Sequence, residues 1–279
     1  MYKRQAYYSR KVPFAYQGIL KTVQFINEVQ DGVIIHDLYV LSEGAQMGFW
    51  ERYHEKRWLS KMMKNGDPIF VFTEFTRQKI QKAFPQSKNE INVLPLDISD
   101  QLMPTDEDAR DVVRYQFAQG DAYFLCTAPI HDSANIIPFL KGFSLFKKRT
   151  NSNMKLVLSG VRGEFSAAIL LALDTYKYRN DIILLDNLTA ADQKDLLCST
   201  YALIHPCRWE RFGMPILDAL KVGVAVLTAE ESSMSEMAGM AGMFFNEKDA
   251  ADIGEKLIRV YNDEQMRNEM IGTGLSRFR

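Results

Sequence analysis

The sequence predicts an α/β protein built from two doubly wound parallel sheets. Short apolar runs, typical of strands covered on both faces, alternate with amphipathic segments typical of helices. Strands that alternate with helices in this way are parallel and joined by right-handed crossovers. The chain has 279 residues, enough for about two domains. An acidic stretch with a proline, 99–106, marks the best boundary, so we expect units at 1–100 and 101–279.

Each expected element is a short stretch of the chain. A doubly wound domain takes on the order of 150 residues, so the first unit is expected to be incomplete. Residues 1–5 fit no later pattern, and we expect a chain truncated at both ends.

The expected strands are 33–38, 69–73 and 91–95 in the first unit, then 123–128, 155–160, 181–186, 201–206, 224–229 and 243–246. The expected helices of the second unit are 107–117, 136–148, 190–199, 214 to about 223, and 250–261.

Composition excludes several classes of protein. The net charge of −1 gives no electrostatic footprint for nucleic acid. Cys126, Cys198 and Cys207 are odd in number and widely spaced, which argues against a disulfide framework or a zinc site and favours a reducing compartment. No apolar run approaches the roughly 20 residues of a membrane span, and no secretory leader is visible. We expect a cytoplasmic location.

The segment 210–218 is the most informative part of the chain. It follows the strand expected at 201–206, and it opens a helix at Met214 and Pro215. Gly213 allows an unusual backbone angle at the turn, and proline is tolerated in a first helical turn. A helix that starts at the carboxyl end of a parallel sheet is a site for anions, above all phosphates. Glu210 and Asp218 flank this helix start and are suited to hold ligand hydroxyls.

These residues carry a family resemblance. The run E-R-F-G-M-P-I-L-D-A from Glu210 is similar to E-G-F-G-L-P-x-L-E-A, the signature of glycosyltransferase family 4, the glycosyl transferases group 1. Downstream, 232–239 resembles the family's S-x-x-P-E-x-x-G. Upstream, 69–76 resembles its strand ending in S-x-x-S, and 92–98 resembles V-x-P-N-G-I-D. The matches run in the family's order from about residue 33 to the end.

The resemblance implies a GT-B fold with an N-terminal acceptor domain and a C-terminal donor domain. It implies transfer of a sugar from a nucleotide-diphosphate-sugar to a glycan or lipid-linked acceptor, with retention of configuration and no required metal or cofactor. Cell-envelope or exopolysaccharide synthesis is the expected setting. It assigns Glu210 to the donor sugar and His36 to the reaction centre, both as catalytic residues. It assigns Asp218 to the ribose, and the backbone at Gly213, Met214 and Pro215 to the diphosphate.

Structural alternatives stay open for these side chains. Glu210 also fits a solvated loop glutamate paired with Arg208 or Arg211, and His36 also fits a structural histidine at a strand end. Asp218 also fits a partner of Lys221, and it is one methylene shorter than the family's glutamate. His131 and His205 are expected to be ordinary loop and strand-end residues, because neither has a partner at metal-ligand spacing.

The loop before Asn135 departs from the family. The family pattern there is G-x-x-x-x-R-K-N, in which the arginine and lysine clamp the diphosphate. Aligned on Asn135, those two positions are Ser133 and Ala134. The loss of two cations weakens an anion site. Arg162, in a glycine-flanked turn, is a candidate replacement, and a solvated loop arginine is the alternative.

Two further segments have a double interpretation. Ser233 and Glu236 have the spacing of a capping box, yet a helix start after strand 224–229 is also a second place for diphosphate amides. Ser233 is therefore a donor-binding candidate. Segment 50–65 is basic and carries Trp50 and Trp58, which fits contact with an anionic lipid or membrane surface. An ordinary amphipathic helix with solvated charges is the more common explanation.

Two functional classes follow. The first is a glycosyltransferase. We expect the truncated chain itself not to catalyse sugar transfer. The second is a degenerate member that binds nucleotide or glycan without turnover, or acts as a partner subunit, as Ser133, Ala134 and Asp218 favour. A nicotinamide-dependent dehydrogenase is rejected because no G-x-G-x-x-G follows any expected strand.

Overall fold

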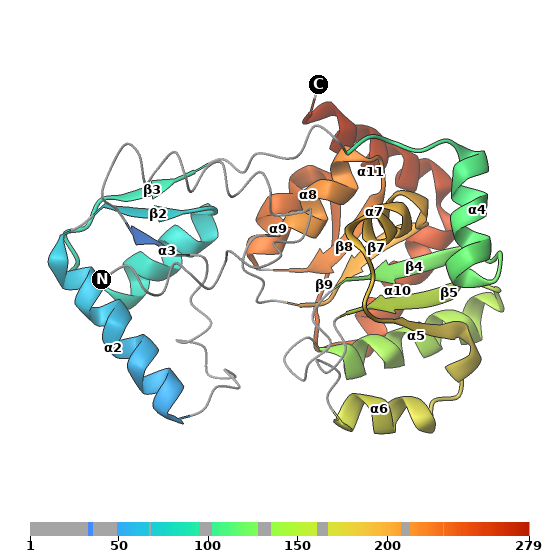
Figure 1. Ribbon diagram of the computed structural model, residues 1–279, viewed down its shortest axis with the longest axis horizontal. Helices are drawn as coiled ribbons and strands as arrows, with labels where there is room; N and C mark the ends of the chain where they lie inside the picture. Colours follow the sequence, from blue (N-terminus) through green and yellow to red (C-terminus); the bar gives the residue numbers. More distant parts are fainter. Residues whose placement is uncertain are drawn as a thin grey trace.

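The computed structural model describes residues 33–35, 49–66, 68–94, 102–127, 135–160, 167–207, 213–230 and 232–278. Within these ranges the chain forms two parallel sheets, one in each half of the sequence (Figure 1). The predicted parallel α/β architecture is therefore confirmed. The expected boundary between residues 100 and 101 lies outside the described residues.

The N-terminal sheet has the order β1-β2-β3, and both strand pairs are parallel. Helices α2 and α3 flank it (Figure 1). Its small core brings Leu59 and Met63 of α2 against Ile69 and Val71 of the central strand and Ile80 of α3. The elements are β1 (Val33–Ile34), α2 (Phe49–Asn65), β2 (Ile69–Val71), α3 (Glu74–Ala83) and β3 (Ile91–Val93).

The C-terminal sheet has the order β6-β5-β4-β7-β8-β9, and every pair is parallel. All six strands start and end within two residues of the predicted bounds. The strands are β4 (Tyr123–Cys126), β5 (Lys155–Ser159), β6 (Ile182–Leu185), β7 (Ala202–His205), β8 (Ala225–Ala229) and β9 (Gly242–Phe245). The helices are α4 (Glu107–Ala118), α5 (Ile136–Thr150), α6 (Ala167–Asp174), α7 (Ala190–Ser199), α8 (Met214–Lys221), α9 (Ser233–Ala238), α10 (Ala250–Asn262) and α11 (Glu264–Ser276).

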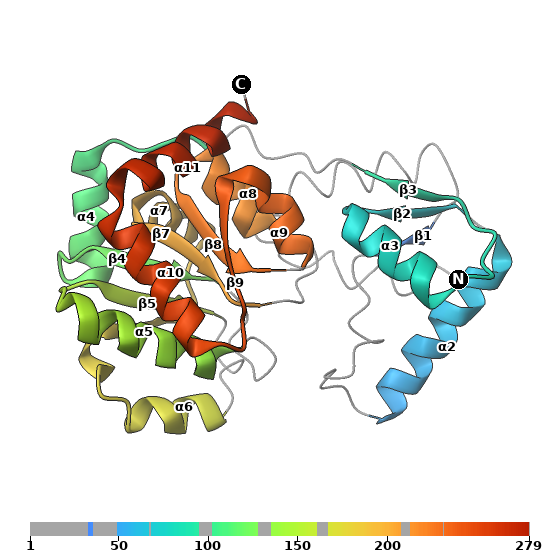
Figure 2. The same cartoon turned by 180° about the vertical axis from the view of Figure 1, so that it is seen from behind.

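Both faces of this sheet are buried. Along β4, Phe124 and Cys126 belong to one core cluster, while Tyr123 and Leu125 belong to the other. This alternation follows from the two-residue period of a strand. The first cluster lies under α5, α6 and α10, which cover the face seen in Figure 2. The second lies under α4, α7, α8 and α9. Continuous apolar strands are what such double coverage requires.

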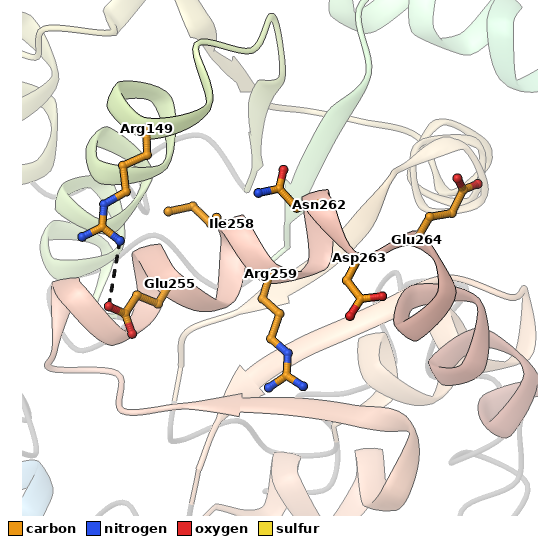
Figure 3. A pocket seen from close by; sticks show the side chains of 7 residues that line it. All are labelled: Arg149, Glu255, Ile258, Arg259, Asn262, Asp263 and Glu264. Atoms are coloured by element: carbon orange, nitrogen blue, oxygen red, sulfur yellow. Dashed lines mark ion pairs between the residues drawn. The ribbon is translucent and has the colours of Figure 1, made fainter.

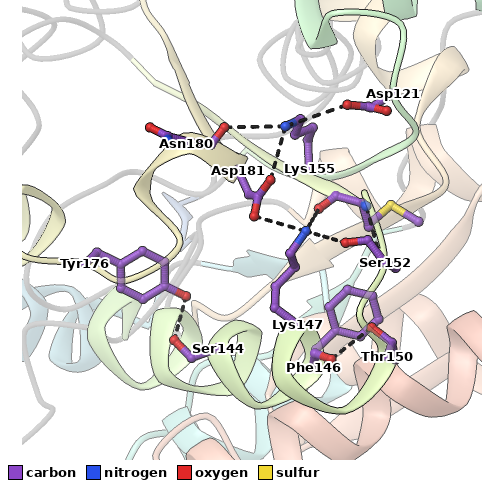
Figure 4. A network of polar contacts seen from close by, with 11 residues as sticks. Asp121, Ser144, Phe146, Lys147, Thr150, Ser152, Lys155, Tyr176, Asn180 and Asp181 are labelled. Carbon is purple, nitrogen blue, oxygen red and sulfur yellow. Dashed lines mark hydrogen bonds and ion pairs between the residues drawn. The ribbon is translucent and has the colours of Figure 1, made fainter.

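The amino edge of the sheet holds a network of charges (Figure 4). Lys147 Nζ lies 3.0 Å from Asp181 Oδ2, and its side chain is only 6% exposed. Lys155 Nζ lies 3.1 Å from Asp181 Oδ1 and 3.6 Å from Asp121 Oδ2. Lys147 also donates to the carbonyls of Ser152 and Met154. These charges satisfy one another inside the fold, so their role is structural.

No helix in the described part of the chain is both long enough and apolar enough to cross a membrane.

Candidate active site at the carboxyl edge

The order of strands in the C-terminal sheet defines a switch point between β4 and β7. From β4 the chain moves outward through β5 and β6, and from β7 it moves the other way through β8 and β9. The helices that follow these two central strands, α5 and α8, therefore begin at the same carboxyl edge, on opposite faces of the sheet. Ligands of open α/β sheets bind at such switch points.

Helix α8 begins at a glycine in the left-handed region. Gly213 has φ 58° and ψ 17°, and the helix start has no side-chain cap. The Gly213 carbonyl accepts from Ile216 N at 3.0 Å and from Leu217 N at 3.3 Å. Pro215 stands in the first turn as predicted. It has no N–H group, so the backbone donors at this start are the amides of Gly213 and Met214.

Helix α5 begins in a similar way. Asn135 has φ 55° and ψ 31°, and its side chain makes no cap bond to the first turn of the helix. Instead Asn135 Nδ2 donates to the carbonyl of Pro206, at 3.5 Å, just beyond the end of β7. The amide thus ties the two sides of the switch point together. The first turn of α5 also has no acidic residue.

Five other described helix starts differ. In α3, α4, α7, α10 and α11 a threonine or aspartate at the N-cap accepts a bond from a first-turn amide. Such caps satisfy the amides that a helix start leaves without partners. The two helix starts at the switch point, α5 and α8, have no such side-chain acceptor. Both are therefore well suited to an anionic ligand.

Asp218 lies one turn into α8, where the motif predicts it. Its side chain is buried, and the residue is 4% exposed. Aspartate is a poor residue for a helix interior, so a compensating interaction is expected at this position. His205, the last residue of β7, is fully buried, and Thr228 Oγ1 donates to its carbonyl at 3.1 Å. This is consistent with the predicted strand-end histidine.

Several predicted site residues lie outside the described part of the chain. These are Glu210, His36 and Arg162, together with Ser133, Ala134 and His131 of the departing loop. The structure does bring Gly213, Met214, Pro215, Asp218 and Asn135 to one edge of one sheet.

The predicted capping box at the start of α9 is wrong by one residue. The N-cap is Ser232, whose hydroxyl accepts from Ser235 N at 3.2 Å, and Ser235 Oγ accepts from Ser232 N at 3.1 Å. Ser233 is the first residue of the helix and Glu236 takes no part in the box. The consecutive serines made two registers equally acceptable by spacing alone. The carboxylate of Glu236 instead contacts the N-terminal unit.

The described residues also outline a hollow of about 480 Å³ between α5, α10 and the start of α11 (Figure 3). Arg149 and Glu255 pair across it at 3.9 Å. Both helices run from the carboxyl edge toward the amino edge, and the hollow includes the end of α10 at Asn262. It therefore lies away from the switch point and contains none of the predicted site residues. No group of three or more potential metal ligands occurs in the part of the chain that the structure describes.

Two relatives of this chain are mannosyltransferases. The chain is 26% identical over 228 residues to the O-antigen chain mannosyltransferase B of Escherichia coli, covering 81% of this chain and 59% of that protein. It is 24% identical over 245 residues to the serotype-specific mannosyltransferase WbdA of Escherichia coli, covering 85% and 30%. The chain thus spans well under two thirds of these relatives.

Solved structures share the fold. Sucrose-phosphate synthase from Thermosynechococcus elongatus matches with a TM-score of 0.72 at 15% identity, covering 98% of this chain and 70% of that one. HepE from Anabaena, in complex with UDP and glucose, matches with a TM-score of 0.71 at 14% identity, covering 94% and 70%. These likenesses confirm the predicted GT-B type of fold.

The family profile described as "Glycosyl transferases group 1" matches residues 108–277, more than half of the chain. The match spans the whole C-terminal sheet, including the switch point and the 213–218 turn and helix. The chain belongs to the glycosyl transferases group 1 family.

Proposed function

We propose that this chain is the donor-binding part of a glycosyltransferase that uses a nucleotide-diphosphate-sugar. The observation that carries the proposal is the pair of helix starts, α5 and α8, that lack side-chain caps at one switch point. A diphosphate placed there receives backbone N–H bonds and two favourable helix dipoles. This supply of positive charge is consistent with catalysis that requires no metal.

The side chains around this site have separate roles in the proposal. Asp218 accepts from the ribose hydroxyls, and Glu210 accepts from hydroxyls of the donor sugar. His36 is assigned to the reaction centre in this proposal, because the ordinary pKa range of histidine suits proton handling. Arg162 replaces part of the charge that Ser133 and Ala134 do not provide. Catalysis then comes from positioning and from stabilising the charge that develops on the leaving diphosphate, with retention at the anomeric carbon.

The names of the relatives favour a mannosyl donor. Two of them are mannosyltransferases, one of which acts on an O-antigen chain. We therefore extend the proposal to transfer of mannose onto a growing cell-envelope polysaccharide. A non-catalytic nucleotide- or glycan-binding member is the second candidate, because Ser133 and Ala134 stand where the family has its cationic clamp.

Calorimetric titration with UDP, GDP and ADP tests the donor site. We expect one diphosphate to bind, and Asp218→Ala to weaken it by about tenfold or more, since a lost hydrogen bond to a charged group is worth about 1.5–3 kcal/mol. Glu210→Ala is expected to have a smaller effect on the diphosphate, because its proposed contact is to the sugar. A folded chain that binds none of the three contradicts the donor site. If the chain binds a diphosphate but its full-length protein transfers no sugar, the result supports the second, non-catalytic candidate.

We also propose that the start of α2 contacts the cytoplasmic face of a membrane. Phe49 and Trp50 are 77% and 71% exposed, and Tyr53 is 47% exposed. The helix carries five Lys or Arg and two Glu residues, a net charge of +3. Aromatic side chains beside basic ones suit an anionic lipid surface.

Sedimentation with vesicles tests this contact. We expect binding to vesicles that contain an anionic lipid, weaker binding to neutral vesicles, and a several-fold loss for Trp50→Ala. Tyr115→Ala is the matched control, since Tyr115 of α4 is 76% exposed in the other unit. Equal binding by both variants contradicts the contact.

A further inference from the structure

The first-turn amides of α3 donate hydrogen bonds to acceptors in two different units. Within the N-terminal unit, the N-cap Thr73 accepts from Thr76 N through Oγ1 at 3.1 Å. The two amides before Thr76 donate to a residue 161 and 162 positions away in sequence. Glu74 N donates to Glu236 Oε1 at 2.7 Å, and Phe75 N donates to Glu236 Oε2 at 2.6 Å. Every amide of this first turn thus has an acceptor.

The contact suits its partners electrostatically. A carboxylate is favoured at a helix N-terminus, where the dipole and the free amides meet it. Both oxygens of Glu236 are used, and both distances are in the short range of charge-assisted bonds. A bidentate contact also fixes orientation, so it constrains how α3 lies relative to α9.

Helix α9 holds this carboxylate on a rigid base. Its start is closed by the capping box of Ser232 and Ser235. Met234 and Met237 are buried in the second core cluster, while Glu236 is on the exposed face. At its other end, Arg277 donates to the carbonyls of Met237 and Ala238. Both views show α9 as the part of the C-terminal unit that faces α3 (Figures 1 and 2).

The same helix touches the candidate active site. A Cβ atom on Gly213 would lie 3.0 Å from Met237 Cγ and 3.3 Å from Met234 Cε. The buried face of α9 therefore packs directly against the turn that starts α8. Beside the polar contact, Phe72 at the end of β2 is 5% exposed and belongs to the same apolar cluster as Met234 and Met237. The junction combines an apolar contact with two charge-assisted hydrogen bonds.

We propose that Glu236 is a positioning residue that latches the N-terminal sheet over the switch point of the C-terminal sheet. The carboxylate is a polar link between the units, and α9 connects that link to the first turn of α8. The consequence for acceptor placement rests on the proposed function. The latch itself concerns only the distance between the two units and does not depend on the proposed function.

Double electron–electron resonance between the units tests the latch in the full chain. Labels at Lys82→Cys of α3 and Glu269→Cys of α11 report the distance, since both positions are exposed and the three native cysteines are buried. We expect one short distance in the parent chain. Glu236→Gln keeps the size of the side chain but removes its charge, and is expected to lower the ratio of short-distance to long-distance conformers by about fivefold or more.

A second variant removes the donor instead of the acceptor. Glu74→Pro deletes the amide that binds Glu236 Oε1 at a helix position that accepts proline. The preceding Thr73 has φ −140° and ψ 149°, which proline allows. Glu74→Ala is its matched control, because it loses the same side chain but keeps the amide. Glu255→Gln controls for removal of an exposed glutamate from a helix of the same unit.

The outcomes separate the latch from simple stability and from the donor site. The latch predicts that Glu236→Gln and Glu74→Pro both broaden the distance, while Glu74→Ala and Glu255→Gln do not, and that the unfolding midpoint of the C-terminal unit stays unchanged. Unaltered distances in both test variants overturn it. Diphosphate affinity should remain within about threefold of the parent in Glu236→Gln, because the donor contacts come from α5 and α8. If the parent chain does not bind diphosphate, the proposed function is contradicted, but the conclusion from the distances is unaffected.

Discussion

At the amino edge of the six-stranded sheet, charged side chains bind one another, whereas at the carboxyl edge two helices begin without side-chain caps. Lys147, Lys155 and Asp181 form ion pairs at 3.0 and 3.1 Å, largely shielded from water. Nearby, Tyr123 donates to the Leu196 carbonyl at 2.7 Å, and burial raises the pKa of that phenol. At the opposite edge, Gly213 and Asn135 start α8 and α5 in the left-handed region.

The difference shows which feature points to a ligand. A cluster of charges with good mutual geometry is complete as it stands and has no need of another partner. Helix starts without side-chain caps, placed at one edge by the strand order, present first-turn amides that a ligand can satisfy. The two edges should therefore respond oppositely to mutation: the amino edge in stability, and the carboxyl edge in affinity.

The largest expected effect is on stability at the amino edge. Asp181→Asn removes the carboxylate that both Lys147 and Lys155 contact, and Lys147 is only 6% exposed. A buried charge left without its partner costs about 3 kcal/mol or more of unfolding free energy. Denaturant unfolding measures this loss, and diphosphate affinity should not change.

Asp121→Asn is the matched control for that experiment. Asp121 lies 3.6 Å from Lys155 and its side chain is 35% exposed. A long pair with a partly exposed carboxylate is expected to contribute about 1 kcal/mol or less. Equal losses in the two variants would show that the network is no more than a surface cluster.

An intermediate effect is expected at the carboxyl edge. Gly213→Ala places a Cβ at φ 58° and 3.0 Å from Met237 Cγ. The left-handed conformation costs a non-glycine residue about 1–2 kcal/mol, so the turn should shift. We expect both a modest loss of stability and weaker diphosphate binding, measured by unfolding and by calorimetry.

Gly272→Ala in α11 controls for this substitution. A Cβ there meets nothing within 4 Å, and alanine is a better helix residue than glycine. The variant should be as stable as the parent or more so, with unchanged affinity. If Gly213→Ala binds diphosphate like the parent, the start of α8 is not the anion site.

Much of this comparison could be predicted from the sequence. Short apolar runs predicted the strand bounds in the C-terminal unit. Gly213, followed two residues later by Pro215, predicted the start of α8. The position of Asp218 within the helix followed from the same motif. These features are local, so a window of ten residues contains the information that determines them.

The remaining features depend on which distant segments meet. The consecutive serines before α9 allow two capping registers, and only the packing of Met234 and Met237 into the core selects Ser232 as the N-cap. The partner of Glu236 lies more than 160 residues away, so no local pattern indicates it. Likewise, the sequence predicts that Lys147, near a helix end, lies on the surface. In the structure it is buried, because Asp181 and two backbone carbonyls surround its ammonium group.

The smallest expected effect concerns α7, which begins at the same carboxyl edge as α8 but caps itself. Thr189 N and Oγ1 donate to Asp192 Oδ2 at 2.9 and 2.7 Å, and these bonds lower the pKa of the Asp192 carboxyl. A lowered pKa in the folded state means that the carboxylate stabilises the fold above its unfolded pKa, ordinarily 3.8. This stabilisation is lost as the pH falls through the lower, folded-state pKa.

Asp192→Asn should therefore be less stable than the parent near neutral pH, and the difference should shrink in acid. Carbon-detected NMR titration of Asp192 checks the direction of the shift, and a pKa at or above the ordinary value contradicts it. At α7 the protein supplies its own anion to the helix start. At α8 the N-cap is a glycine without a side chain, so there the anion is proposed to come from the ligand. If added diphosphate stabilises the chain against unfolding while leaving the Asp192 titration unchanged, the two helix starts differ in the way the comparison requires.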